Sequence, residues 1–243
     1  MPNVINLGSL GNRGFRMEGV GAEDRAGISV SSAGDFNADG YADLIVAAVD
    51  GSGFTGEFYL VFGKAGGFGT LSLPSLSPPD GFVITRAGSN TFPWFAVASA
   101  GDINGDGYDD VIIGVADGDS GGEHSGDAYV LFGKADGFGA IDLDNLAAAD
   151  GFLIQGEGGG SLTGWSVSEA GDVNGDGFDD IIIGAPRLDS GGRTDVGAVY
   201  VIFGKSGSFG SIDLGSLAAA DGVRILGNRG NFGVSVSSAG DVN

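Results

Sequence analysis

The stretch DINGDGYDD, from Asp102 to Asp110, shows how this chain is organised. Side chains with oxygen donors stand at its positions 1, 3, 5 and 9, and the Gly at position 6 allows the backbone to turn with a positive φ. The same spacing returns in DFNADGYAD, residues 35–43, and in DVNGDGFDD, residues 172–180. In chain order, 35–43, 102–110 and 172–180 are called aspartate loops 1, 2 and 3.

Several carboxylates in one tight turn repel each other unless a hard cation lies between them, so the spacing indicates a calcium-binding loop. It resembles the front half of an EF-hand loop, but Ile113 stands at position 12 of loop 2, where an EF-hand has Glu. The ninth-position Asp leads directly into an apolar run, so each loop is predicted to join two strands. One copy alone would also fit an Asx-rich hairpin turn that binds nothing, but three copies at one spacing favour calcium.

Composition excludes several function classes. The 243 residues carry 11 Lys plus Arg against 32 Asp plus Glu, a formal charge of −21, which argues against nucleic acid and anionic membrane surfaces as partners. Without Cys there is no disulfide or thiol chemistry. The N-terminal MPNVINLGSL lacks the basic start and long apolar core of a signal peptide, and no apolar run approaches membrane-spanning length. We therefore expect no membrane insertion.

One unit is repeated along the chain. The triplet Ala-Gly-Asp ends at Asp35, Asp102, Asp172 and Asp241, with spacings of 67, 70 and 69 residues. Phe-Gly-Lys returns at 62–64, 132–134 and 203–205. We predict a single domain of about three and a half repeats. Its parts are 1–25, the end of a preceding repeat, then repeats 26–92, 93–162 and 163–231, and 232–243, the start of a truncated fourth repeat.

Four strands are predicted in each repeat. They are 28–32, 97–99 and 167–168 before the loops, 44–48, 111–115 and 181–185 after them, 58–62, 128–132 and 198–203 at Phe-Gly-Lys, and 82–85, 152–155 and 223–226 last. The second strand is apolar throughout, which is typical of a strand covered on both faces. A short helical turn is expected at 147–149. The fold class is therefore all-β, with propeller blades of four antiparallel strands. A calcium-binding β-solenoid is disfavoured, because its motifs would recur about every nine residues.

The repeat resembles the FG-GAP repeat of integrin α-subunit propellers and of bacterial surface and secreted proteins. The best match is GWSVSEAGDVNGDGFDDIIIGAP, residues 164–186. Elsewhere the FG-GAP signature is incomplete. GVA at 114–116 and AAV at 47–49 stand where GAP is expected. The Phe-Gly half, which precedes the first strand of a repeat and is separate from Phe-Gly-Lys, survives only at 232–233. The resemblance implies seven blades in the full ring, of which about half are present, so the chain is expected to be a segment of something longer.

The resemblance also implies a ligand set for about three Ca²⁺ ions. In loop 1 it is Asp35, Asn37, Asp39, the Tyr41 carbonyl and Asp43; in loop 2 it is Asp102, Asn104, Asp106, the Tyr108 carbonyl and Asp110; in loop 3 it is Asp172, Asn174, Asp176, the Phe178 carbonyl and Asp180. Ligands that are all oxygen favour Ca²⁺ over zinc or copper, which prefer nitrogen and sulfur. Mg²⁺ would need a stricter octahedron and more retained water.

No catalytic residue or organic cofactor site is predicted. His124, the single histidine, lies in a polar Gly-rich loop without a nucleophile motif. Residues 204–206, Gly-Lys-Ser, resemble the tail of a phosphate-binding loop, but Val199 stands where that motif requires Gly. Asp109 and Asp110 adjoin each other on a strand, so their side chains point to opposite faces. One is expected to ligate while the other caps or faces water.

Two classes of function remain. The first is a non-catalytic, calcium-dependent module for adhesion or recognition, extracellular or at the cell surface, with a protein or glycan ligand. The alternative is an accessory propeller of a larger secreted hydrolase, such as a phospholipase or a polysaccharide-degrading enzyme. Trp94, Phe95 and Trp165 either pack between blades or form a stacking platform for a ligand. The remaining blades of a longer protein, or a second copy of the chain, are expected to close the ring.

Overall fold

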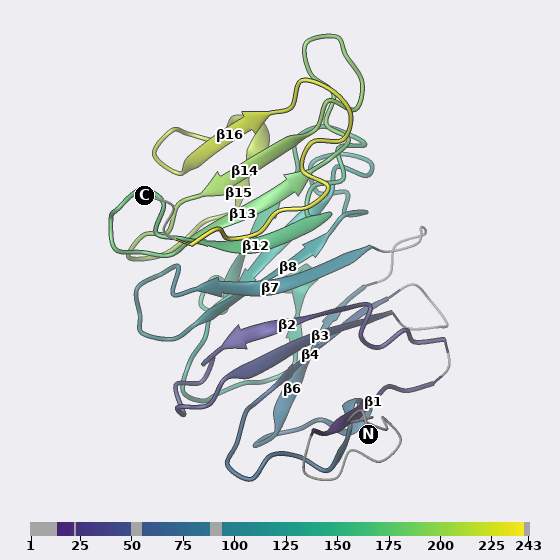
Figure 1. Ribbon diagram of the computed structural model, residues 1–243, viewed down its shortest axis with the longest axis vertical. Helices are drawn as coiled ribbons and strands as arrows, with labels where there is room; N and C mark the ends of the chain where they lie inside the picture. Colours follow the sequence, from purple (N-terminus) through teal and green to yellow (C-terminus); the bar gives the residue numbers. More distant parts are fainter. Residues whose placement is uncertain (1–13, 22, 50–54, 88–93, 241–243) are drawn as a thin grey trace, which may run out of the picture.

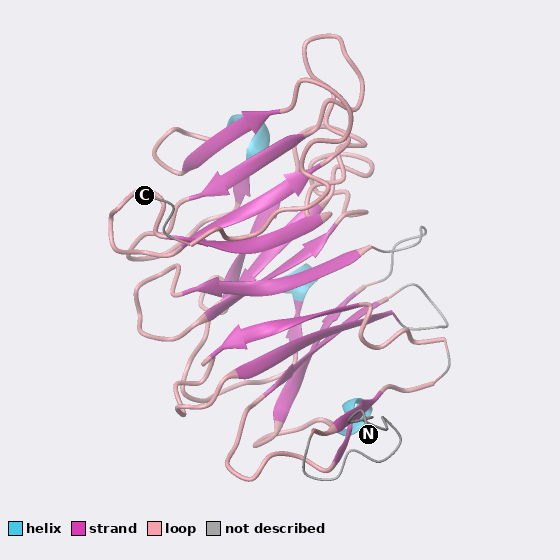
Figure 2. Cartoon of the chain, in the orientation of Figure 1, coloured by secondary structure: helices cyan, strands magenta, loops and turns pink. Residues whose placement is uncertain are grey.

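Three antiparallel sheets are stacked face to face along the long axis of the molecule (Figures 1 and 2). The computed structural model describes residues 14–21, 23–49, 55–87 and 94–240. The VINLGSL segment at 4–10, Pro93 and the start of a fourth aspartate loop at 241–243 lie outside the described residues. None of the described elements is a helix long and apolar enough to cross a membrane.

Each blade has four main strands, whose order across the sheet follows their order along the chain. Blade 1 contains β2 (Ser29–Gly34), β3 (Asp43–Val49), β4 (Gly56–Val61) and β6 (Gly81–Arg86). Blade 2 contains β7 (Phe95–Gly101), β8 (Asp110–Val115), β9 (Asp127–Leu131) and β11 (Gly151–Gln155). Blade 3 contains β12 (Ser166–Gly171), β13 (Asp180–Ala185), β14 (Ala198–Ile202) and β16 (Gly222–Leu226). The order and antiparallel pairing within each blade confirm the predicted all-β fold of a partial propeller.

The apolar second strand of a blade supplies two cores at once. Along β8, Val111 and Ile113 are buried in the core between blades 1 and 2, whereas Ile112 is buried in the core between blades 2 and 3. Successive side chains of a strand point to opposite faces, so a strand between two neighbouring blades must be apolar at every position. This confirms the predicted double coverage.

A fifth short strand, which the sequence analysis did not predict, connects each blade to the one before it. The strands β5 (Thr70–Ser72), β10 (Ile141–Asp142) and β15 (Ile212–Asp213) pair in parallel with β1 (Arg16–Glu18), β6 and β11, respectively. Each is followed by a 3₁₀ turn: η2 (Leu73–Ser75), η3 (Leu143–Asn145) and η4 (Leu214–Ser216). The 3₁₀ turn lies before the helical turn predicted at 147–149, and the Asp142 carboxylate caps it by accepting the Asp144 N–H at 3.1 Å. Residues 147–150 form a separate single turn, which is closed by the bond from the Asp150 N–H to the Ala147 carbonyl at 2.8 Å.

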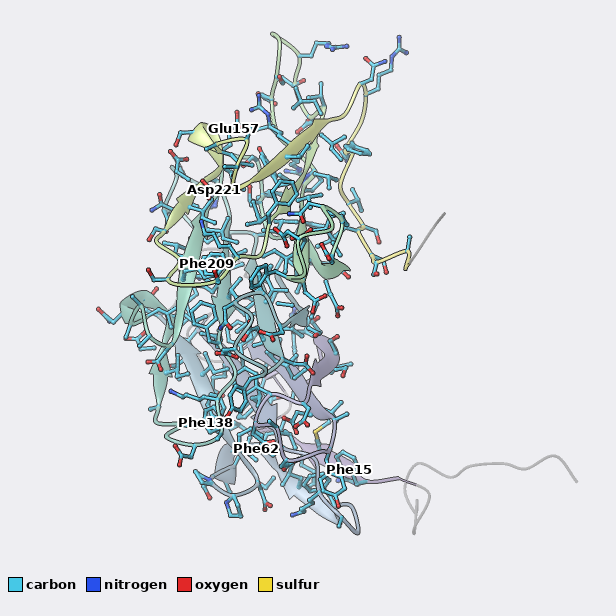
Figure 3. The ribbon with its side chains drawn as sticks, turned by 90° about the vertical axis from the view of Figure 1, so that its left-hand side faces the viewer. Phe15, Phe62, Phe138, Glu157, Phe209 and Asp221 are labelled. Atoms are coloured by element: carbon cyan, nitrogen blue, oxygen red, sulfur yellow. The ribbon has the colours of Figure 1, made fainter. Side chains whose placement is uncertain are left out.

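Aromatic rings fasten these connections to the preceding blade. Phe138 stacks on Phe82 of blade 1 with ring centroids 4.8 Å apart, and Phe209 stacks on Phe152 of blade 2 at 4.4 Å. Figure 3 shows Phe138 and Phe209 at successive levels of the stack. The lysine of Phe-Gly-Lys lies over the same ring, with Lys134 Nζ 5.6 Å from the Phe138 centroid and 2.7 Å from an Asp150 oxygen. The repeated Phe-Gly-Lys motif thus contributes to the joint between blades.

Candidate metal centre

The three aspartate loops occupy equivalent places on one edge of the stack. Each joins the first strand of its blade to the second: β2 to β3, β7 to β8 and β12 to β13. In Figure 1 this edge lies on the left, where the arrows of β2 and β7 end. The loops therefore repeat in space as they do in sequence.

Carboxylates fix the turn inside each loop. In loop 2, Asp102 accepts the Asp106 N–H through Oδ1 at 3.0 Å and the Gly107 N–H through Oδ2 at 2.9 Å. The Asp106 carboxylate in turn accepts the Tyr108 N–H at 3.0 Å. Loops 1 and 3 contain the same three bonds at the corresponding positions. The turn itself therefore requires Asp at positions 1 and 5, because their carboxylate oxygens accept the backbone N–H groups of the turn.

The ninth-position carboxylates point inward and are buried. Asp110 accepts the Ile103 N–H through Oδ2 at 3.1 Å and the Gly133 N–H through Oδ1 at 2.8 Å. Asp43 and Asp180 make the corresponding pairs of bonds in blades 1 and 3. Each therefore ties its loop to the Phe-Gly-Lys segment of the same blade.

Burial makes these inner carboxylates costly to ionise. Desolvation raises the pKa of Asp110 to about 8 and that of Asp43 to about 6, and the other carboxylates of each loop add to the rise. Burial raises the pKa of Asp180 as well. The backbone N–H donors oppose the shift without cancelling it. If all the carboxylates of a loop were ionised together, its protein donors would therefore offset the negative charge only in part.

The donor chemistry of the loops fits a hard cation. Their candidate ligands are carboxylate, amide and carbonyl oxygens, which Ca²⁺ prefers. Across the described part of the chain, however, no group of three or more His, Cys, Asp or Glu side chains is gathered closely enough to hold a metal ion. The carboxylates of positions 1, 5 and 9 instead accept backbone N–H groups. The predicted ligands at positions 1, 3, 5, 7 and 9 would hold the ion, and they stay a prediction.

The eighth-position Asp has a role that the sequence analysis missed in part. Asp109 does cap, as expected for the neighbour of Asp110, but it caps the preceding loop: its Oδ2 accepts the Asp35 N–H at 2.6 Å. Asp179 accepts the Asp102 N–H in the same way at 2.9 Å. Ala42 occupies position 8 of loop 1. This variation at position 8 is a signal that the position serves something other than ligation.

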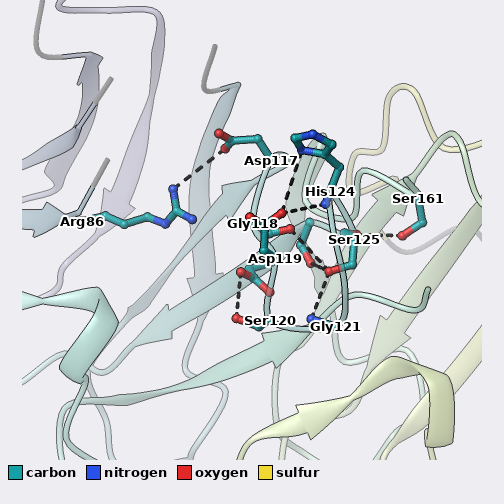
Figure 4. Close-up of polar contacts among 11 residues, drawn as sticks. Arg86, Asp117, Gly118, Asp119, Ser120, Gly121, His124, Ser125 and Ser161 are labelled. Carbon is teal, nitrogen blue, oxygen red and sulfur yellow. Dashed lines mark hydrogen bonds and ion pairs between the residues drawn. The ribbon is translucent and has the colours of Figure 1, made fainter. Parts of the chain in front are cut away.

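The opposite edge of the stack carries the tryptophans and the histidine. Trp94 and Trp165, which enter blades 2 and 3, stack with ring centroids 4.4 Å apart, which confirms the predicted packing between blades. Trp94 is still 44% exposed, so a ligand platform stays a prediction. His124 lies in the loop between β8 and β9, with Nδ1 3.9 Å from an Asp119 oxygen (Figure 4). The His124 side chain is 37% exposed, and its neighbours in Figure 4 belong to the polar Gly-rich loop noted in the sequence.

Comparison with known proteins agrees with the fold and with the loops. The FG-GAP repeat model matches residues 26–61, 94–131 and 163–202. The chain is 37% identical over 143 residues to phosphatidylinositol-glycan-specific phospholipase D of Bos taurus, covering 58% of this chain and 16% of that protein. It is 29% identical over 224 residues to integrin alpha pat-2 of Caenorhabditis elegans, covering 90% of this chain and 17% of that protein. It is 30% identical over 160 residues to integrin alpha-PS3 of Drosophila melanogaster, covering 64% of this chain and 13% of that protein.

The chain thus spans less than a fifth of each of these relatives, and the matched repeats coincide with the three blades. Each matched region begins before the first strand of a blade and ends at the third. Each contains one complete aspartate loop. We conclude that the chain contains three FG-GAP repeats, which form successive blades of a partial propeller.

Proposed function

We propose that this chain is a calcium-binding, non-catalytic propeller segment that serves extracellular adhesion or ligand recognition. One observation carries the proposal: three equivalent loops on one edge of the stack each bury a carboxylate within an all-oxygen donor set. A hard cation would offset the charge that burial and neighbouring carboxylates leave uncompensated. The similarity to integrin α chains supports an adhesive role and a location outside the cell or at its surface.

The ligand is proposed to bind at the edge opposite the aspartate loops. There the connections 116–126 and 156–165 are joined by backbone bonds such as Thr163 N–H to the Ser125 carbonyl at 2.9 Å. Their sequences differ from blade to blade, whereas the aspartate loops repeat. Trp94 supplies an exposed aromatic surface next to them, suited to a protein or glycan partner. The charge of −21 disfavours nucleic acid.

A second candidate function is that of an accessory propeller in a larger secreted hydrolase. The similarity to a phospholipase D over 58% of this chain favours it. In that case the catalytic groups would lie outside this segment, and the blades would position those groups. Both candidate functions include the calcium sites. They differ in whether the blades belong to an adhesion protein or to a larger hydrolase.

Metal analysis and binding assays on the purified chain test the proposal. We expect about three Ca²⁺ per chain, binding to a glycan or protein array that chelator abolishes, and weaker binding in Trp94→Ala. Ester, phosphodiester and glycan substrates should be hydrolysed only at background rates. Activity that disappears in Asp176→Ala but survives in His124→Ala would show a catalytic rather than a structural metal.

The outer face of blade 3 is proposed to be covered by the remaining blades, supplied by a longer polypeptide or by a second copy. On β16, Val223, Ile225 and Leu226 are 45–46% exposed. An exposed sheet face and edge favour association. Light scattering on the chain should therefore show self-association, and a cooperatively melting monomer would argue against this arrangement.

A further inference from the structure

We propose that the aspartate loops bind Ca²⁺ cooperatively between neighbouring blades, with Asp109 and Asp179 as the positioning residues that couple them. The inference rests on the proposed calcium binding and adds how the sites communicate. It starts from an observation that ligation does not explain: a carboxylate of one loop is directed at the first ligand position of the loop before it.

The direct contact is a pair of hydrogen bonds between residues of adjacent blades. Asp35 donates its N–H to Asp109 Oδ2 at 2.6 Å, and Asp109 donates its own N–H to the Asp35 carbonyl at 3.4 Å. The next pair of loops repeats the side-chain bond, from Asp102 N–H to Asp179 Oδ2 at 2.9 Å. Position 8 of one loop therefore holds the backbone of position 1 in its neighbour.

The repeated Ala-Gly-Asp triplet leaves the space that this contact needs. A Cβ at Gly34 would lie 2.2 Å from Asp109 Oδ2, and a Cβ at Gly101 would lie 2.3 Å from Asp179 Oδ2. Gly171 has the same place before loop 3, and a Cβ there would meet nothing within 4 Å in the described structure. All three glycines have positive φ, so the turn favours glycine in every blade, and in two of them the missing side chain also leaves room for the neighbouring carboxylate.

A second set of bonds links the same loops through the buried carboxylates. The Lys134 N–H donates to the Phe36 carbonyl in loop 1 at 3.0 Å, and the adjacent Gly133 N–H donates to Asp110 in loop 2 at 2.8 Å. In the next blade, Lys205 and Gly204 bridge the Ile103 carbonyl and Asp180 in the same manner. A continuous chain of hydrogen bonds therefore passes from loop 1 to loop 3.

Side-chain packing follows the same path. The ring of Phe178, at position 7 of loop 3, lies against Gly105 of loop 2, where a Cβ would be 2.4 Å from the ring. Position 7 is also the predicted carbonyl ligand of loop 3. An ion in loop 3 would thus order the backbone on which both Phe178 and Asp179 stand.

These contacts define a nearest-neighbour scheme. An ion in loop 2 fixes residues 108–110, which holds Asp109 against loop 1 and lowers the cost of ordering loop 1 when it binds. Coupling of binding free energies is reciprocal, so loop 1 must assist loop 2 equally. The contacts join loops 1 and 2 and loops 2 and 3, so loops 1 and 3 should communicate only through loop 2.

Site-resolved calcium titration by NMR tests the scheme. The N–H groups of Gly40, Gly107 and Gly177 each donate to the first carboxylate of their loop, so their amide signals report the three sites separately. Disabling the middle site with Asp106→Ala should weaken binding at loops 1 and 3, each by about fivefold or more. Asp39→Ala should weaken loop 2 and spare loop 3, and Asp176→Ala should weaken loop 2 and spare loop 1.

Substitution of the positioning residue isolates the link. Asp109→Ala should keep three ions bound, abolish the coupling between loops 1 and 2, and preserve that between loops 2 and 3. Asp109→Asn retains an oxygen acceptor for the Asp35 N–H and should restore most of the coupling. Asp136→Ala, at an exposed aspartate outside the loops, is the charge-matched control. The amide spectrum of each variant shows that it is folded.

The outcomes separate the two proposals. If Ca²⁺ shifts none of the three glycine signals, the proposed function is overturned, and the coupling with it. Calcium binding at three loops whose affinities ignore Asp106→Ala would overturn the coupling alone. A weakening of loop 1 by Asp109→Ala that persists unchanged in the Asp106→Ala background would show a purely local effect of Asp109, and would also overturn the link.

Discussion

The two edges of the blades differ in how their buried charged side chains are hydrogen-bonded. At the aspartate-loop edge, each buried carboxylate accepts two backbone N–H groups, and the pattern is repeated in all three blades. At the opposite edge, Arg86 and Asp127 are 9% and 1% exposed, yet Arg86 Nε and Asp127 Oδ1 have no hydrogen-bond partner in the described part of the chain. Buried polar groups without partners carry a desolvation cost. At the first edge the buried carboxylates thus have backbone donors, whereas at the second some buried polar atoms have no hydrogen-bond partner in the described part of the chain.

The contacts of this polar cluster are specific to the joint between blades 1 and 2. Arg86 ends β6 of blade 1, and its Nη1 lies 3.9 Å from Asp117 Oδ1 in the β8–β9 loop (Figure 4). Ser120 donates its hydroxyl to Asp127 Oδ2 at 3.0 Å. At the joint between blades 2 and 3, the contact is a different one: Tyr200, on the third strand of blade 3, donates its hydroxyl to Glu157 at 2.6 Å. Repeated contacts at one edge therefore set the architecture, while the other edge varies.

Removal of calcium should have the largest effect, and it acts on the aspartate-loop edge alone. Ligand linkage adds about 2.7 kcal/mol of stability per site at a hundredfold excess of Ca²⁺ over its dissociation constant. Thermal unfolding in Ca²⁺ and in chelator, together with a metal count, measures the difference. An unchanged melting temperature with fewer than two ions bound would contradict the proposal that the aspartate-loop edge binds calcium.

Asp110→Ala should rank next, and it separates the buried carboxylate from the exposed ones. The substitution leaves the Ile103 and Gly133 N–H groups without their acceptor, at a cost of about 1–3 kcal/mol for each group that stays buried. Asp106→Ala, at an exposed position of the same loop, is the matched control. Urea unfolding in chelator should show Asp110→Ala to be the less stable variant, and equal stabilities would remove the structural role of position 9.

A pH series tests the charge at the opposite edge. Burial above all raises the pKa of Asp127 from 3.8 to about 6. The folded chain therefore retains a proton that the unfolded chain releases, so this group lowers stability as the pH rises from about 4 to about 6. Relative to Asp127→Asn, the wild-type protein should lose about 2 kcal/mol across that window. Denaturant unfolding in chelator from pH 4 to 7 measures it, and parallel curves would refute the shift.

Trp94→Ala should have the smallest effect on stability. An aromatic pair contributes about 0.5–1.5 kcal/mol beyond its buried area, and half-exposed Trp94 loses little else. Calcium binding at the other edge should be unchanged, whereas ligand binding should weaken. A large drop in melting temperature would mean that the Trp94–Trp165 stack holds blades 2 and 3 together.

Local patterns in the sequence were enough for the four main strands of each blade and for the aspartate loops. The strand predicted at 111–115 is β8, Asp110–Val115, because an unbroken apolar run between two turns has few other ways to bury itself. The turn at 102–110 likewise follows from residues within a nine-residue stretch, since Asp102 accepts N–H groups only four and five positions away. The fold class and the candidate ligands were therefore readable from spacing, together with the family resemblance.

The packing of one blade on the next was decided only by the tertiary structure. Asp109 and Asp35 are separated by 74 residues, and no sequence pattern near either residue predicts the contact between them. The parallel pairing of β10 with β6 and the stack of Phe138 on Phe82 have the same origin. Such contacts depend on the spacing and angle between whole sheets, which arise from the summed packing of both faces. For this protein, the chemistry of each loop is local in the sequence, and the coupling between loops is a property of the stack.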